Sequence, residues 1–210
     1  SQVISAAILT FGALPAVAGA PVVAGAPHRP DSGTIVIHCG DVIDGLAAEP
    51  LGPATITIRG GRIVVVEKET ARGSLAGAGD AAALDLRDMT CLPGLIDMHT
   101  HLTDRPGDTA DLSVYYRRNR EDQAPIALEN ARTTLLAGFT TARDVGTYIA
   151  WADRDLRDAI DAGRAIGPRM QVSGFYLTVP GGGGDLVIPG HPESEIPAQV
   201  RVGEVRWAVE

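Results

Sequence analysis

One stretch, residues 92–102, constrains the fold of this chain more than any other. It reads LPGLIDMHTHL, so that a Pro-Gly turn opens a short apolar run, which ends in two histidines one residue apart. The run is too short for a core helix, and its apolar residues favour a buried strand over residues 95–101. Because alternate side chains of a strand share a face, we expect His99 and His101 to point into one space.

Two imidazoles that converge from a rigid strand suit a divalent metal of the zinc type. Asp97 lies two residues before His99 and shares its face, so it is a candidate to hydrogen-bond a metal-bound histidine. The alternative is a pair of buried, hydrogen-bonded histidines on a core strand, with Asp97 as an ordinary paired carboxylate.

Residues 93–101 (PGLIDMHTH) resemble the first barrel strand of the amidohydrolase superfamily of metal-dependent hydrolases. Residues 137–146 (AGFTTARDVG) resemble the second strand of its imidazolonepropionase-like and prolidase-like (Xaa-Pro dipeptidase-like) branch. Residues 167–185, from GPRM to GGGGD, resemble the third strand and the loop after it. The three motifs occur in the family's order, and the resemblance runs from about Gly33 to the C-terminus.

We therefore expect an α/β protein, the first part of a (β/α)8 TIM-like barrel preceded by a small β-sandwich. Residues 1–32 would be a signal-like apolar segment and linker, residues 33–92 a sandwich that is incomplete without C-terminal strands, and residues 93–210 the first three β/α units. A complete barrel takes about 250 residues, and only 116 run from Leu95 to Glu210. The sequence thus predicts the N-terminal portion of a barrel enzyme.

The local patterns agree with this division of the chain. β-branched runs predict strands in the first part, with a hairpin turn at Gly60-Gly61. In the second part, helical and strand patterns alternate as in a parallel α/β barrel. The predicted strands are 34–38, 54–59, 62–67 and 82–86, followed by strand 95–101, helix 124–135, strand 139–143, a helix that stops at Gly163, strand 170–173 and helical spacing over 202–209.

The N-terminal segment and the cysteines bear on localisation. Residues 3–26 are apolar and uncharged, and two Ala-Gly-Ala triplets fit the small-residue cleavage pattern of a secretory signal. We expect export, periplasmic or secreted, with a flexible apolar tail as the alternative. Cys39 and Cys91 are interpreted as two separate buried thiols, with a single disulfide as the alternative in an oxidising compartment.

The resemblance implies that His99 and His101 bind the more buried metal of a centre with one or two divalent ions, such as zinc, where the metal activates a water. It also implies a carboxylated lysine, two further histidines and an aspartate base on later strands. Lys68, the only lysine, precedes the barrel, and no histidine follows His191. No catalytic base is therefore assignable here, and we expect the isolated 210-residue chain to be inactive without a complementary C-terminal segment of the same protein.

Two further residues are candidates at the barrel rim. Asp144 ends the second strand and either shapes the site or pairs with Arg143 or a neighbouring loop. The prolidase-like branch often has a histidine in the glycine-rich loop, where this chain has Gly183. His191 is a candidate to replace it in substrate binding, and the alternative is a solvated rim histidine.

The leading hypothesis is a metal-dependent amidohydrolase that cleaves the amide bond of a dipeptide or N-acyl amino acid. The alternatives are a cyclic-amide (imidazolone-type) hydrolase and a non-catalytic fragment or interaction module. With 26 acidic against 18 basic residues and a net charge of −8, the chain has no basic footprint for nucleic acid or anionic membrane. We expect a small-molecule substrate and a homo-oligomer.

Overall fold

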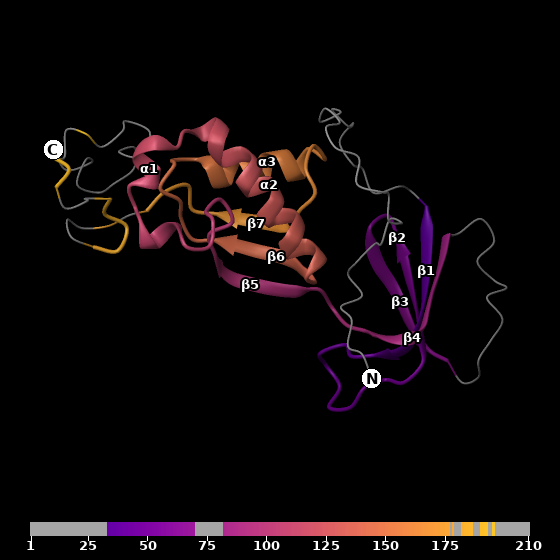
Figure 1. Ribbon diagram of the computed structural model, residues 1–210. Coiled ribbons are helices and arrows are strands. Elements are labelled where there is room, and N and C mark those ends of the chain that lie inside the picture. Colours follow the sequence, from indigo (N-terminus) through magenta and orange to yellow (C-terminus); the bar gives the residue numbers. More distant parts are fainter. Residues whose placement is uncertain are drawn as a thin grey trace. The chain divides into compact units, whose positions relative to one another are not determined.

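A computed structural model describes residues 33–69, 82–176, 178, 182–186, 190–192 and 195 (Figure 1). The described residues form two compact units, with the boundary between Leu95 and Ile96. The predicted signal segment, residues 1–32, and the helical spacing at residues 202–209 lie outside the described residues. Within the described part of the chain, no helix is long and apolar enough to cross a membrane.

The first unit is built on a four-stranded sheet with the strand order β3-β2-β1-β4. Its strands are β1 (Thr34–Val42), β2 (Ala54–Arg59), β3 (Arg62–Lys68) and β4 (Ala82–Cys91). β2 pairs antiparallel with β1 and β3, whereas β4 pairs parallel with β1. All four predicted strands are confirmed, and β1 and β4 extend four and five residues further than predicted.

The turn between β2 and β3 is the predicted glycine hairpin. Gly60 and Gly61 have φ angles of 56° and 74°. Two successive positive φ angles match the right-handed twist of a two-residue hairpin, and glycine adopts them without steric strain.

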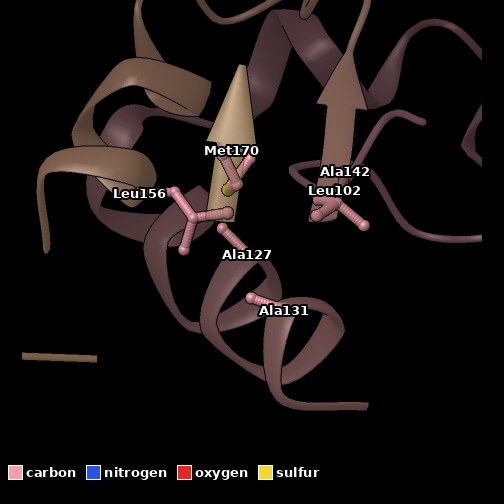
Figure 2. Packing of buried hydrophobic residues seen from close by; sticks show 6 residues of the cluster. All are labelled: Leu102, Ala127, Ala131, Ala142, Leu156 and Met170. Atoms are coloured by element: carbon pink, nitrogen blue, oxygen red, sulfur yellow. The ribbon is translucent and has the colours of Figure 1, made fainter. Parts of the chain in front are cut away.

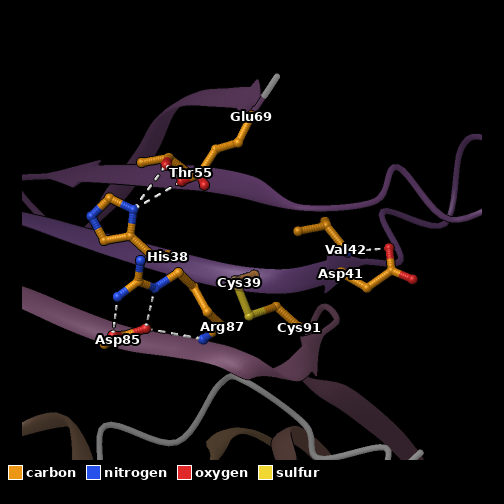
Figure 3. The surroundings of a disulfide bond; sticks show 9 residues. All are labelled: His38, Cys39, Asp41, Val42, Thr55, Glu69, Asp85, Arg87 and Cys91. Carbon is orange, nitrogen blue, oxygen red and sulfur yellow. Dashed lines mark hydrogen bonds and ion pairs between the residues drawn. A yellow bond between two sulfur atoms is a disulfide. The ribbon is translucent and has the colours of Figure 1, made fainter. Parts of the chain in front are cut away.

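One face of this sheet is apolar and carries the core of the unit. Ile37, Cys39 and Ala54 are buried there, together with Val42 and Cys91. The other face carries a polar cluster in which His38 Nδ1 lies 2.9 Å from Glu69 Oε1 and 3.1 Å from Thr55 Oγ1 (Figure 3). The hydrogen bond from His38 lowers the pKa of Glu69 below its ordinary value.

The interpretation of the two cysteines as separate thiols is wrong. Cys39 and Cys91 form a disulfide, with Cα atoms 5.9 Å apart, that links β1 to β4 (Figure 3). The parallel pairing of these strands places Cys91 opposite Val42, and a bulge in the register follows Cys39. At the bulge β4 presses on β1 so closely that a Cβ on Gly40 would lie 2.2 Å from the Arg87 carbonyl oxygen.

The second unit contains a three-stranded sheet in the order β5-β6-β7. Strand β6 pairs parallel with β7, and helices α2 and α3 pack on this sheet as in a β/α barrel (Figure 1). The elements are β5 (Leu95–Thr100), a 3₁₀ turn (Asp108–Ala110), α1 (Val114–Arg117), α2 (Arg120–Leu136), β6 (Phe139–Asp144), α3 (Ala152–Asp161) and β7 (Arg169–Val172).

Helix α2 begins earlier than the apolar spacing predicts. Asn119 accepts a hydrogen bond from the Asp122 amide, and the Asp122 side chain accepts one from the Asn119 amide, which forms a capping box. Pro125 therefore lies inside the helix instead of near its start, as predicted. The stop is confirmed, because Gly138 follows the helix with a φ angle of 98°.

Small and apolar side chains pack the helices against the sheet (Figure 2). Ala127 and Ala131 on α2 meet Leu156 on α3 and Met170 on β7, and Ala142 on β6 completes the layer with Leu102. The alanines allow a close approach between helix and sheet. The contact leaves no room at Gly167, where a Cβ would lie 2.9 Å from the Ala131 Cβ.

The expectation that residues 95–101 form a buried strand is half right. The strand exists and ends at Thr100, but Leu95, Ile96 and Met98 are 41%, 60% and 49% exposed. In a complete barrel, the inward side chains of a strand pack against those of the opposite strands. The described residues supply three strands of that wall, so the side chains of β5 stay exposed.

Candidate metal and substrate site

His99 and His101 lie together where β5 ends. Their ring centroids are 5.4 Å apart, and the rings meet edge to face at 77°. His99 belongs to the strand, whereas His101 follows it directly. The structure thus brings the two predicted metal ligands to the carboxyl end of a barrel strand, where active sites of this fold are built.

The Nδ1 atom of His101 is held by two oxygens. It lies 2.9 Å from the Gly146 carbonyl oxygen and 3.0 Å from the Tyr176 hydroxyl oxygen. Because a carbonyl oxygen can only accept, Nδ1 must carry the ring proton. In the neutral imidazole Nε2 then keeps its lone pair, and this tautomer is the form that ligates a metal.

Tyr176 follows β7 and fits a space that glycines leave open. A Cβ on Gly146 would lie 2.4 Å from Tyr176 Cε1, and a Cβ on Gly184 would lie 2.6 Å from Tyr176 Cβ. The Tyr148 ring packs on it at a centroid distance of 4.8 Å. Burial raises the pKa of the Tyr176 hydroxyl above its ordinary value, so this group stays protonated.

Asp144 fixes the backbone around His101. Its carboxylate is 1% exposed and accepts hydrogen bonds from the amides of Leu102, at 2.7 Å, and Gly146, at 3.2 Å. Burial raises the pKa of Asp144 to about 7. Arg143 points elsewhere and donates to the Met98 carbonyl at 2.8 Å. The structure shows the contact with a neighbouring loop, and the role of Asp144 in shaping the site stays a prediction.

Asp97 acts on backbone as well. Its carboxylate accepts a hydrogen bond from the His99 amide at 3.0 Å. The contact ties the carboxylate to the strand that presents the first histidine. It fixes the main chain of His99 and does not involve its imidazole.

Helix α2 holds the loop that follows His101. The Asn130 amide group donates to the carbonyl oxygens of Leu102, at 2.9 Å, and Asp104, at 2.7 Å. Gln123, which is fully buried, donates to the Thr103 carbonyl and to the Asp104 carboxylate. Burial raises the pKa of Asp104 to about 6. These contacts leave the loop little freedom to move the histidine.

A cavity of about 570 Å³ opens beside His101. It has the size of a pocket for a small organic molecule. Its wall combines aromatic, hydroxyl and charged side chains: His101, Leu102, Asp104, Arg105, Pro106, Gly107, Thr109, Asn130, Thr133, Thr134, Tyr148, Tyr176 and Gly183.

Three of these residues, Asp104, Tyr148 and Tyr176, were missed by the sequence reasoning. The available signal was their position, since each lies in a loop that follows a predicted barrel strand. Position alone could not select them from their neighbours. The contacts that bring these residues into the site join positions as much as 75 residues apart in the sequence.

His191 lies apart from the lining of this cavity. Its Nδ1 is 2.8 Å from Glu195 Oε2, and its ring packs edge to face on Tyr116 at 5.5 Å. Its role in substrate binding stays a prediction. Gly183 does line the cavity, and its carbonyl accepts a hydrogen bond from Tyr148 at 3.1 Å.

His99 and His101 fit half of a metal site. Both present an imidazole at a strand end, and one has a defined tautomer with Nε2 available. Among the residues whose positions are described, no group of three or more His, Cys, Asp or Glu side chains could hold a metal ion.

The chain belongs to the amidohydrolase family, whose model matches residues 90–206, more than half of the sequence. A comparison with curated proteins gave no match. The family match begins just before β5 and contains every residue of the site. The chain accordingly carries the first part of an amidohydrolase barrel after a small β domain.

Solved structures that resemble this chain include amidohydrolases of the prolidase type. A Xaa-Pro dipeptidase with bound methionine in its active site is 33% identical, with a TM-score of 0.66, over 77% of this chain and 38% of that one. A prolidase complexed with N-methylphosphonate-L-proline is 31% identical, with a TM-score of 0.59, over 75% and 37%. Molinate hydrolase is 25% identical, with a TM-score of 0.54, over 70% and 31%. The chain spans less than two fifths of the length of each.

Proposed function

We propose that this chain supplies His99 and His101 as metal ligands to a metal-dependent hydrolase that cleaves the amide bond of a dipeptide or N-acyl amino acid. The bound divalent ion, zinc in the simplest case and one or two in number, would supply an activated water and polarise the scissile carbonyl. The likeness to a Xaa-Pro dipeptidase and a prolidase supports this substrate class.

The observation that carries the proposal is the hydrogen bond from His101 Nδ1 to the Gly146 carbonyl. It presents Nε2 as a ligand before any metal arrives, and metal-bound histidines characteristically make such a bond with their other nitrogen. A core histidine without a ligand would need both nitrogens satisfied within the protein. The cavity beside His101 provides the space for a substrate of dipeptide size.

The remaining residues of the site have positioning roles. Asp144 and Asn130 bind the amide and the carbonyl of Leu102, the residue after His101. Asp97 binds the amide of His99. They limit movement of the two imidazoles, so that less entropy is lost when the metal binds. The group that takes a proton from the water and gives it to the leaving amine lies outside this set, since Asp144 is engaged with backbone amides.

The test is a panel of Xaa-Pro dipeptides, N-acyl amino acids and cyclic amides, assayed with the full-length protein before and after removal of metal by a chelator. We expect chelator-sensitive turnover of a linear amide that zinc restores. Turnover of cyclic amides alone would favour the imidazolone-type alternative. Metal binding without turnover of any substrate would favour a non-catalytic role.

The complementary segment of the same protein is also part of this proposal. Three strands cannot close an eight-stranded barrel, and β5 leaves apolar side chains exposed. We expect residues 1–210 alone to be inactive and loosely folded, and a homo-oligomer to form once the barrel is complete. Chelator-sensitive turnover by the lone 210-residue chain would refute this part of the proposal.

Export is a separate proposal, and the disulfide supports it. Disulfides persist in oxidising compartments and are rare in a reducing cytosol. Cys39 and Cys91 are both buried, at 0% and 1% exposure, so their bond is shielded from reductants. Cell fractionation tests the location, and mass measured after thiol labelling with and without reduction tests the bond.

A further inference from the structure

Tyr176 has a hydroxyl proton that its contact with His101 does not use. Since the Gly146 carbonyl requires the proton on His101 Nδ1, the Tyr176 oxygen can only accept from that same N–H. Its own O–H must then point to another acceptor. In the part of the chain that the structure describes, the hydroxyl has no other hydrogen-bond partner.

The neighbouring tyrosine of the cavity differs in this respect. Tyr148 donates its proton to the Gly183 carbonyl at 3.1 Å. Both rings line the 570 Å³ cavity. Tyr176 is therefore the tyrosine that lines the cavity beside a metal-ligand histidine and keeps a proton to donate.

We propose that the Tyr176 hydroxyl donates a hydrogen bond to the carbonyl oxygen of the amide that is cleaved. This assignment rests on the proposed hydrolase function and adds a catalytic residue to it. When water adds to the amide carbon, negative charge develops on that oxygen, and a fixed donor stabilises the transition state more than the ground state. No bond to Tyr176 forms or breaks in this role.

The surroundings of Tyr176 suit a fixed donor. Gly146 and Gly184 press on its ring from positions where a Cβ would clash, and Tyr148 and His101 pack on it at centroid distances of 4.8 and 5.8 Å. The hydroxyl therefore needs little reorganisation when the substrate arrives. A donor that is positioned before the reaction contributes most to catalysis.

The test compares Tyr176→Phe with the wild-type full-length protein on an amide substrate and its thioamide. We expect kcat for the amide to fall about 100-fold, with bound metal and KM little changed. The thioamide should lose much less, because sulfur is a weak hydrogen-bond acceptor. Tyr116→Phe is the matched control, since it removes a hydroxyl that donates to the Leu186 carbonyl and does not line the cavity.

Two results would overturn the role of Tyr176. One is an unchanged kcat in Tyr176→Phe. The other is an equal loss on both substrates that follows a loss of metal, which would mean that Tyr176 only positions His101. A wild-type protein that hydrolyses no amide would instead refute the hydrolase proposal, and the role of Tyr176 with it.

Discussion

The two units of this chain use different means to fix their main chain. The small β unit relies on strand pairing, an apolar face and one covalent bond between Cys39 and Cys91. The barrel unit adds fully buried polar side chains that bind loop backbone. Asp144 and Asp153, at 1% and 0% exposure, accept hydrogen bonds from the loop amides of Leu102 and Gly174, respectively.

The difference shows that the loops of the barrel unit require fixed positions for their groups more than they require added stability. A buried polar side chain contributes little net free energy, but it specifies one position for the groups that it binds. In the barrel unit such side chains gather in the loops that follow the strands, where the candidate ligands lie. In the β unit the core needs only to hold the sheet together.

The largest effect is expected from the ligands themselves. His99→Ala combined with His101→Ala should remove most of the bound metal and activity of the full-length protein, because zinc needs three or four ligands. Metal content after dialysis, measured by atomic emission, checks this. His38→Ala is the control on the β unit, and normal metal content in the double variant would end the site assignment.

The covalent bond of the β unit should have the next largest effect. Cys39→Ser with Cys91→Ser opens a link across 52 residues of sequence, worth about 4 kcal/mol in the chain-entropy account. Hydrogen exchange at the amides of β1 should rise, whereas metal affinity should stay unchanged. A loss of metal in this variant would contradict the division of roles between the units.

Asp144→Ala should lower both the stability of the protein and its affinity for metal, unlike the cysteine variant. The substitution leaves the buried amides of Leu102 and Gly146 without an acceptor, which should cost about 3 kcal/mol and weaken metal binding. Unfolding in urea and competition with a chelator measure the two effects. Asp161→Ala, at the exposed end of α3, should change neither.

The smallest effect is expected from Asn130, the residue of α2 that binds the loop after His101. Asn130→Ala removes two hydrogen bonds to the loop after His101 and should cost about 1 to 2 kcal/mol, with a lesser loss of metal affinity. Glu129→Ala, one residue earlier on the exposed face of α2, is the control. Equal stability and affinity in the two variants would show that the loop holds its conformation unaided.

The sequence predicted what depends on local pattern. Strand positions, the glycine hairpin at Gly60-Gly61 and the pairing of His99 with His101 follow from residue type and spacing, and all are confirmed. The start of α2 was missed because the apolar spacing begins later than the Asn119 cap. An Asn with Asp three residues on was a usable signal.

What the sequence could not predict depends on contacts between distant residues. The disulfide needs β1 and β4 to pair in parallel across a bulge, and no local pattern specifies that register. The contact of Tyr176 with His101 joins residues 75 positions apart and requires two glycines to make room for the ring. The exposure of β5 reflects the number of strands around it, and its own residues gave no sign of it.

Gly183 has a consequence for how this protein can diversify. Among the described residues, no heavy atom lies within 4 Å of a Cβ at this position, and the residue lies in the wall of the cavity. A Cβ introduced there would meet no described neighbour, unlike one at Gly184, which would lie 2.6 Å from Tyr176 Cβ. A single codon therefore separates this protein from a series of narrower or differently charged cavities, which makes position 183 the natural first site for a saturation library that seeks new substrate preferences.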